Sequence, residues 1–185
     1  MKRVFIGLPL TDKAAHPLLK AQNHDISGAR WQMRDNLHIT LNFLGEVEDK
    51  DLEALQENLR KIHQNDFTIH MNGVGTFTRG KTEIPKILWA GVEKTAALVN
   101  LKEAVDKACR TAGIHIDDRP YCPHVTIARL TDASREDVEN FLKEHKNLSA
   151  PAYRAKEFIL YQSHLHDTGS IYRPLRHFPL QNRQH

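Results

Sequence analysis

Polar and apolar residues alternate without a break along one stretch of the sequence, Asn36-Leu37-His38-Ile39-Thr40-Leu41-Asn42-Phe43. Successive side chains of a β-strand point to opposite faces, so this pattern predicts a strand. Its four apolar residues must face a core, and its four polar residues then line solvent or a cleft. His38 and Thr40 share the polar face about 6.5–7 Å apart, so both can contact one phosphate-sized group.

The same unit of histidine, apolar residue, threonine and apolar residue returns at His124-Val125-Thr126-Ile127. A bare His-x-Thr match carries little weight, because a chain with 12 His is expected to contain one by chance. His166-Asp167-Thr168 is such a match: it lacks apolar flanks, continues into Gly169 and is typical of a turn. The two strand-like copies indicate two halves of the chain that each give one strand to a shared cleft.

Helical spacing of apolar residues marks a small number of segments, namely 49–64, 95–112 and 134–145, with a fourth over 11–23 that contains Pro17. Terminal signals support two of them. Thr95 can cap the second helix and Gly113 can end it. Ser134 and Asp137 resemble a capping box at the start of the third.

Strand-like runs are more numerous and cover 2–8, 29–33, 36–44, 66–72, 87–92, 122–129, 155–162 and 171–177. Segment 73–86 contains three Gly and predicts a loop, which is made basic by Arg79, Lys81 and Lys86. Because strands outnumber helices and many are hairpin-like, we expect an α+β fold with antiparallel sheets rather than a doubly wound parallel sheet.

Composition places the chain among globular proteins. Its 185 residues are 40% hydrophobic and 26% charged, which excludes a disordered tail, a collagen-like repeat and a disulfide-dense miniprotein. The formal charge of +3 permits an anionic partner without requiring one. The apolar run over 4–10 is too short for a signal peptide, and no stretch approaches the roughly 20 apolar residues of a membrane span. Cys109 and Cys122 are expected to be reduced and buried, so we expect a cytoplasmic protein.

The two units resemble the paired HxTx motifs of the 2H phosphoesterase superfamily. Their flanks are similar to one branch of it, the RNA 2′,3′-cyclic phosphodiesterases, also called 2′-5′ RNA ligases. The similar segments are 36–47, 123–129, 3–7, 73–77, 172–175 and 178–180. The resemblance implies a single bilobal domain over residues 1–185. Its two pseudo-symmetric lobes are each an antiparallel β-sheet with outer helices, and the active-site cleft lies between them.

The residues fit the hydrolysis of a ribose 2′,3′-cyclic phosphate. Water attacks phosphorus in line with the leaving ribose oxygen, so one group must accept a proton and another must donate one. Imidazole can serve either role near neutral pH, and the residues alone leave open which histidine is the acid. The resemblance implies that His38 is the proton donor, that His124 is the proton acceptor and that the product is a 2′-phosphomonoester. Thr40 and Thr126 would donate hydrogen bonds to the non-bridging oxygens.

The expected substrate is RNA with a 2′,3′-cyclic phosphate terminus or a cyclic nucleotide, and ligation is the same exchange with a ribose 5′-hydroxyl in place of water. No metal or other cofactor is required, and neither a membrane nor an obligate protein partner is expected. Within this enzyme class, the substrate could instead be a cyclic-phosphorylated nucleotide metabolite or a 2′-5′ linked oligonucleotide. A non-catalytic RNA or nucleotide binder that keeps the cleft, and a histidine-based metal protein, are the rival functions.

Several further residues have two interpretations. Arg129 is a candidate substrate-binding residue, but its parity puts it on the face of Val125 and Ile127 unless the strand bulges there. The basic residues of segment 73–86 either guide RNA phosphates or form a charged surface loop. A metal chelate and a solvated strand both fit His164, His166 and His177, and core packing and base stacking both fit Phe5, Trp31 and Trp89.

Overall fold

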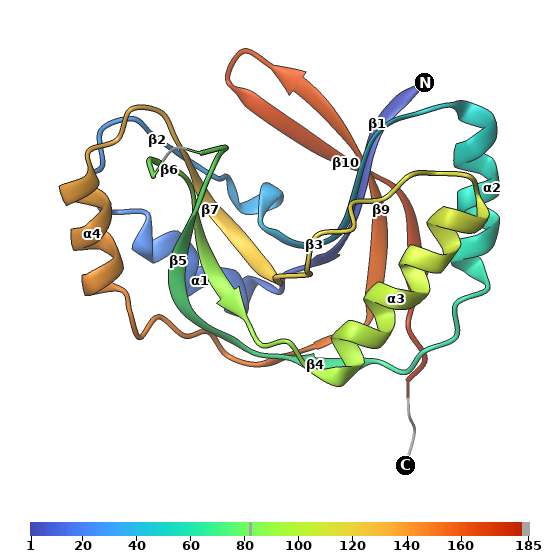
Figure 1. The fold of residues 1–185 in the computed structure, drawn as a ribbon. Coiled ribbons are helices and arrows are strands. Elements are labelled where there is room, and N and C mark those ends of the chain that lie inside the picture. Colours follow the sequence, from blue (N-terminus) through green and yellow to red (C-terminus); the bar gives the residue numbers. More distant parts are fainter. Residues whose placement is uncertain (82, 183–185) are drawn as a thin grey trace.

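A computed structural model describes residues 1–81 and 83–182 (Figure 1). Within these residues, the main sheet has the strand order β10-β9-β1-β3-β7-β6-β5, and β2 also pairs with β7. The bounds of its strands are β1 Lys2–Pro9, β2 Ala29–Trp31, β3 His38–Val47, β5 Met71–Thr78, β6 Pro85–Val92, β7 His124–Leu130, β9 Glu157–His166 and β10 Gly169–Pro179. A second, two-stranded sheet pairs β4 (Phe67–Ile69) with β8 (Tyr153–Ala155).

The pairings between the named strands are antiparallel, and four α-helices accompany them in the described part of the chain. The helices are α1 Asp12–Ala21, α2 Asp49–Arg60, α3 Ala96–Thr111 and α4 Arg135–Glu144. The predicted α+β class is therefore confirmed, and each predicted helix is present with its centre in place.

The main sheet consists of two halves joined by a narrow seam. β1 pairs with β3 from Lys2↔Val47 to Pro9↔His38, whereas the pairing recorded between β3 and β7 is the single pair Ile39↔Val125. In Figure 1 the half formed by β1, β3, β9 and β10 diverges from the half formed by β5, β6 and β7 on either side of this seam. The first half carries α2 and α3, and the second carries α1 and α4 (Figure 1).

Apolar residues of the helices bind each half together. Leu52 and Leu55 of α2 and Leu98 and Leu101 of α3 are buried in one cluster with Val4 and Ile6 of β1. Val138 and Phe141 of α4 are buried in a second cluster with Leu88, Ala128 and Leu130. Burial of such side chains stabilises the fold by about 1.5–3 kcal/mol each. Both polar faces of the HxTx strands are thus held on a packed base.

The predicted helix ends are confirmed by hydrogen bonds. Thr95 Oγ1 accepts from the amide of Leu98 at 3.3 Å, and Ser134 Oγ accepts from the amide of Asp137 at 3.0 Å. Gly113 follows α3 with a φ of 77°, a conformation that glycine adopts without the steric cost of a Cβ.

The predicted loop over 73–86 is too long at both ends. Its first residues belong to β5, which continues to Thr78, and its last residues belong to β6, which begins at Pro85. The Gly residues that suggested a loop instead fit a strand with a close neighbour. A Cβ on Gly75 would lie 2.3 Å from the indole of Trp89, which pairs with it on β6. Gly75 therefore makes room for a tryptophan, as strand glycines do where another group approaches closely.

The two cysteines differ in environment. Cys109 is buried in α3, as expected, and burial raises the pKa of its thiol to about 12. Cys122 is exposed, which corrects the expectation that both thiols are buried, because it precedes β7 instead of lying within it. Among the described residues, no helix is long and apolar enough to span a membrane.

Candidate active site

The alternation that predicts β3 stops just after the first motif. Leu41 and Asn42 are both buried, at 3% and 5% exposed, and Phe43 is 54% exposed. The predicted faces of Asn42 and Phe43 are therefore wrong. The cause is a register shift against β1, where Ile6 pairs with Asn42 but Gly7 pairs with Thr40. One extra residue in a strand exchanges the faces of the residues next to it, so Phe43 joins the side of His38 and Thr40.

The second motif has the same irregularity at the same place. Ile127 and Ala128 are both buried, and Arg129 is exposed. The register against β6 shifts between Leu88 and Trp89. The bulge decides the open question of parity, because it returns Arg129 to the face that carries His124 and Thr126. Phe43 and Arg129 are thus equivalent positions in the two halves.

Antiparallel pairing across the seam brings the two motifs together. Ile39 lies opposite Val125, and both side chains are fully buried. Neighbours on either side of such a pair are opposite each other and point to the other face. His38 therefore lies across from Thr126, and Thr40 lies across from His124. Four side chains that the sequence places in two distant segments share one polar face.

Each histidine is oriented by a backbone carbonyl two residues before it. Nδ1 of His38 lies 2.7 Å from the oxygen of Asn36, and Nδ1 of His124 lies 2.7 Å from the oxygen of Cys122. A carbonyl oxygen only accepts, so both Nδ1 atoms carry the proton and donate. The lone pair of each neutral ring is then on Nε2. Nε2 of His38 accepts from the Thr40 hydroxyl at 2.9 Å. Sequence reasoning missed these carbonyl contacts and had no signal for them, because any residue supplies a carbonyl.

Both imidazoles are neutral near pH 7 in this structure. The pKa of His38 is lowered from 6.5 to about 4: burial is the largest cause, the bond to Asn36 opposes it, and repulsion of the imidazolium by a protonated His124 and by Arg129 adds to the lowering. Burial also lowers the pKa of His124, opposed by its bond to Cys122.

Aromatic rings surround each histidine. The ring of His38 lies 4.6 Å from that of Phe5 and 5.3 Å from that of Tyr172. The ring of His124 lies 4.9 Å from that of Phe77 and 6.2 Å from that of Trp89. Sequence reasoning considered Phe5 and Trp89 but missed the other two, because only strand pairing shows which aromatic residue meets which histidine. These rings exclude water from one side of each imidazole.

The remaining candidates lie outside the two motif strands β3 and β7. Trp31 packs against Phe141 with ring centroids 5.9 Å apart, which confirms its core interpretation. Arg79 and Lys81 lie between β5 and β6, and Lys86 lies within β6. Asp167 and Thr168 form the predicted turn between β9 and β10.

The histidines considered as a metal chelate are separated. His164 pairs with Ile171 and His177 pairs with Ile159, so about five residues of strand, or roughly 16 Å, divide them. Nδ1 of His177 contacts a carboxylate oxygen of Glu157 at 3.0 Å instead. The structure therefore does not support this chelate.

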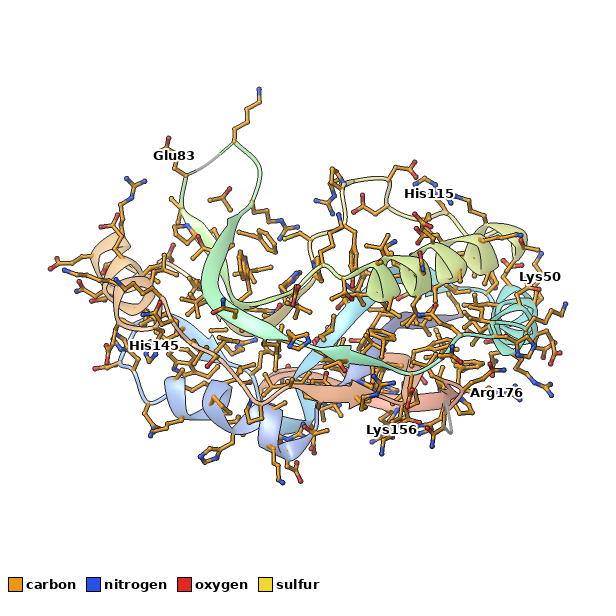
Figure 2. All side chains as sticks on the ribbon, turned by 90° about the horizontal axis from the view of Figure 1, so that it is seen from below. Lys50, Glu83, His115, His145, Lys156 and Arg176 are labelled. Carbon is orange, nitrogen blue, oxygen red and sulfur yellow. The ribbon has the colours of Figure 1, made fainter. Side chains whose placement is uncertain are left out.

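A different group of metal-ligating side chains meets near α4, formed by His24, Glu144 and His145. Figure 2 shows His145 beside α4 at one edge of the molecule, opposite the end that carries Lys50. The ligand atoms all lie within 4.8 Å of one another, and Nδ1 of His24 lies 3.1 Å from a carboxylate oxygen of Glu144. A direct contact between His24 and Glu144 accounts for part of this group without a metal ion, and the group is remote from the seam.

Comparison with known proteins agrees with the motifs. Residues 13–167 match the 2′-5′ RNA ligase superfamily. A protein of Geobacillus stearothermophilus named RNA 2′,3′-cyclic phosphodiesterase is 32% identical over 97% of this chain and 58% of its own length. This chain thus spans little more than half of that relative. A protein of the same name from Archaeoglobus fulgidus is 30% identical over 95% of this chain and 99% of its own.

Solved structures share the fold. The crystal structure of E. coli LigT complexed with 3′-AMP has a TM-score of 0.79 and 26% identity, covering 97% of this chain and 98% of that one. The structure of TT0787 of Thermus thermophilus has a TM-score of 0.79 and 25% identity, covering 98% and 100%. The resemblance drawn from the two motifs is confirmed, and the chain belongs to the 2′-5′ RNA ligase superfamily.

Proposed function

We propose that this protein is an RNA 2′,3′-cyclic phosphodiesterase that forms 2′-phosphomonoesters, with His38 and His124 as its acid and base. The observation that carries the proposal is the pair of equivalent imidazoles on one face of the β3–β7 seam, each with Nδ1 bound to a backbone carbonyl. This leaves Nε2 of each ring as the atom that exchanges a proton with substrate. Relatives that match nearly the whole chain are named for this activity.

In the proposed reaction, Nε2 of His124 accepts a proton from water as the water oxygen bonds to phosphorus. The bond from phosphorus to the 3′ oxygen breaks on the opposite side, and protonated Nε2 of His38 donates its proton to that oxygen. Thr40 and Thr126 donate hydrogen bonds to the non-bridging oxygens, where negative charge accumulates. No further group is needed to balance the step. Ligation is the same exchange, with the 5′-hydroxyl of a second RNA end replacing water as the nucleophile.

The role of proton donor requires that His38 be charged when substrate is bound. Its pKa of about 4 in the free protein means that it is neutral before binding. An anionic phosphate beside Nε2 favours the imidazolium and raises this pKa. Burial then makes the imidazolium a strong acid that gives its proton readily to the leaving oxygen. Arg129 is proposed to bind a phosphate oxygen, because the bulge turns its side chain to the same face.

The proposal covers the whole sequence. Residues 1–185 are proposed to act as one bilobal domain. Each half supplies one of the two histidines, so neither half contains a complete site by itself. RNA ending in a 2′,3′-cyclic phosphate is the proposed substrate class, and the 3′-AMP complex of E. coli LigT is consistent with nucleotide recognition on this fold. A cytoplasmic location is proposed with it, on the basis of two free thiols.

The test is a product assay on a short RNA with a 2′,3′-cyclic phosphate end, run with EDTA on the wild type, His38→Ala and His124→Ala. We expect the wild type to produce only the 2′-phosphate and both variants to lose activity. Tight binding without turnover in the wild type would instead identify a non-catalytic binder. Loss of wild-type turnover in EDTA would identify a metal-dependent protein. A 3′-phosphate product would reverse the assignment of the leaving oxygen.

A further inference from the structure

The backbone pairing recorded between β3 and β7 ends at Ile39 and Val125, and a side chain takes over at the next residue of β3. The hydroxyl of Tyr121 donates to the carbonyl oxygen of Thr40 at 2.9 Å. Tyr121 precedes β7 and belongs to the second half of the site, whereas Thr40 belongs to the first motif. A single hydroxyl thus connects the two halves beside the reacting groups.

We propose that Tyr121 is a positioning residue that fixes the first motif relative to His124 through this hydrogen bond. The inference rests on the proposed function, because its effect is on the geometry of the acid and the base. Tyr121 contacts no reacting atom in this arrangement. It acts through the Thr40 backbone, whose side chain is itself bonded to Nε2 of His38.

The segment around Tyr121 is suited to hold both motifs at once. The carbonyl of the next residue, Cys122, is the acceptor for Nδ1 of His124. Pro120 and Pro123 flank the pair, and each proline ring restricts its own φ to about −65°. Two adjacent residues therefore set the backbone of Thr40 and the ring of His124. A change in the position of one is transmitted to the other.

Helix α3 holds the Tyr121 ring in place. Nζ of Lys102 lies 5.5 Å from the ring centroid and 2.5 Å from a carboxylate oxygen of Asp106. Asp106 also accepts from the side-chain amide of Asn42 at 2.6 Å. The side chains of Lys102 and Asp106 are only 13% and 16% exposed, so this ion pair is weakly screened by solvent.

The bulge in β3 is what brings Asn42 to this network. Strict alternation would place Asn42 on the catalytic face, and the register shift turns it toward α3 instead. Asp106 consequently contacts β3 through Asn42, and Lys102 contacts Tyr121 in the segment that precedes the second motif. The Tyr121 hydroxyl remains a donor over the physiological range, because burial raises the pKa of the phenol.

The experiment compares Tyr121→Phe with Tyr153→Phe. Tyr153 is partly buried, as Tyr121 is, and donates to a backbone carbonyl, that of Pro9, at 3.0 Å. Pro9 pairs with His38 on β1, so this control removes a comparable bond beside the same histidine that does not join the two motifs. Both variants keep the ring, and thermal unfolding measures the stability that each one loses.

We expect Tyr121→Phe to reduce kcat about 3- to 10-fold with KM changed less than about twofold, as one lost hydrogen bond allows. Tyr153→Phe should keep the wild-type kcat at an equal loss in Tm.

Equal kcat for Tyr121→Phe and Tyr153→Phe overturns the inference while the proposed function stands. A wild type that does not hydrolyse cyclic phosphate ends, although folded, overturns the proposed function first. The two failures are thus distinguished by the wild-type assay alone.

Discussion

Ile39 lies directly across from Val125 at the seam between β3 and β7, and neither side chain is exposed to solvent. This apolar pair forms the underside of a polar face that carries His38, Thr40, His124 and Thr126. The packing of two aliphatic residues therefore sets how close the two motifs can lie. Stability and catalysis are coupled at this point of the molecule.

Replacing Ile39 by Ala should lower the free energy of unfolding by about 2–5 kcal/mol, the usual cost of deleting a fully buried aliphatic side chain. Ile171→Ala is the control, because Ile171 is 43% exposed on β10 and should cost much less. Urea unfolding followed by circular dichroism measures both. Equal losses in the two variants would contradict the packing of the seam described above.

The pH profile of kcat/KM should reach its maximum below pH 6.5. This quantity reports the free enzyme, in which the pKa values of both His38 and His124 are lowered. The maximum of kcat should lie at higher pH, since the bound phosphate anion raises the pKa of the proton donor. Steady-state rates between pH 4 and 9 at constant ionic strength test this. Coinciding maxima would count against a donor that is charged only on binding.

Stability should fall as the pH falls from about 6.5 to 4. In this window the unfolded chain protonates His38 and the folded chain does not, because its pKa is lowered to about 4. The unfolded state binds more protons, so the free energy of unfolding rises with pH, by about 1–3 kcal/mol across the window. His38→Gln should flatten this dependence.

The control for that measurement is His166→Gln, which removes an exposed histidine at the end of β9. It should retain the wild-type slope in urea unfolding at several pH values. A slope that is unchanged in His38→Gln would show that His38 titrates normally in the folded protein.

Alanine at either histidine should cost far more rate than alanine at either threonine. A positioned acid or base contributes about 10²–10⁴-fold, whereas a hydrogen bond to a charged oxygen contributes about 10–100-fold. Single-turnover rates of the four variants, His38→Ala, His124→Ala, Thr40→Ala and Thr126→Ala, provide the comparison. Equal losses in all four would refute the division of roles.

Arg129→Gln should raise KM for a cyclic phosphate end more than it lowers kcat. The guanidinium shares the face of His124 but is not asked to transfer a proton. Arg135→Gln is a suitable control, since Arg135 pairs with Glu83 on an exposed surface. The opposite pattern, a lower kcat at constant KM, would show that Arg129 stabilises the transition state and contributes little to substrate binding.

Local patterns predicted the elements well because helix and strand periodicities are properties of short segments. The helices over 49–64, 95–112 and 134–145 are present, and their caps at Thr95 and Ser134 are formed as expected. The loop over 73–86 was predicted wrongly because a glycine such as Gly75 is typical of a loop when only the sequence is known. In the fold it leaves room for a large side chain on the neighbouring strand. That side chain is Trp89.

The sequence alone determined that two histidine–threonine units lie on polar strand faces, and their flanks were sufficient to identify the family. Only the tertiary structure decided that Asn42 turns inward, that Phe43 and Arg129 turn outward, and that the Tyr121 hydroxyl reaches Thr40. Alternation is local and can be read from one strand. A register shift or a cross-strand hydrogen bond depends on the partner strand, so it exists only once both halves have folded together.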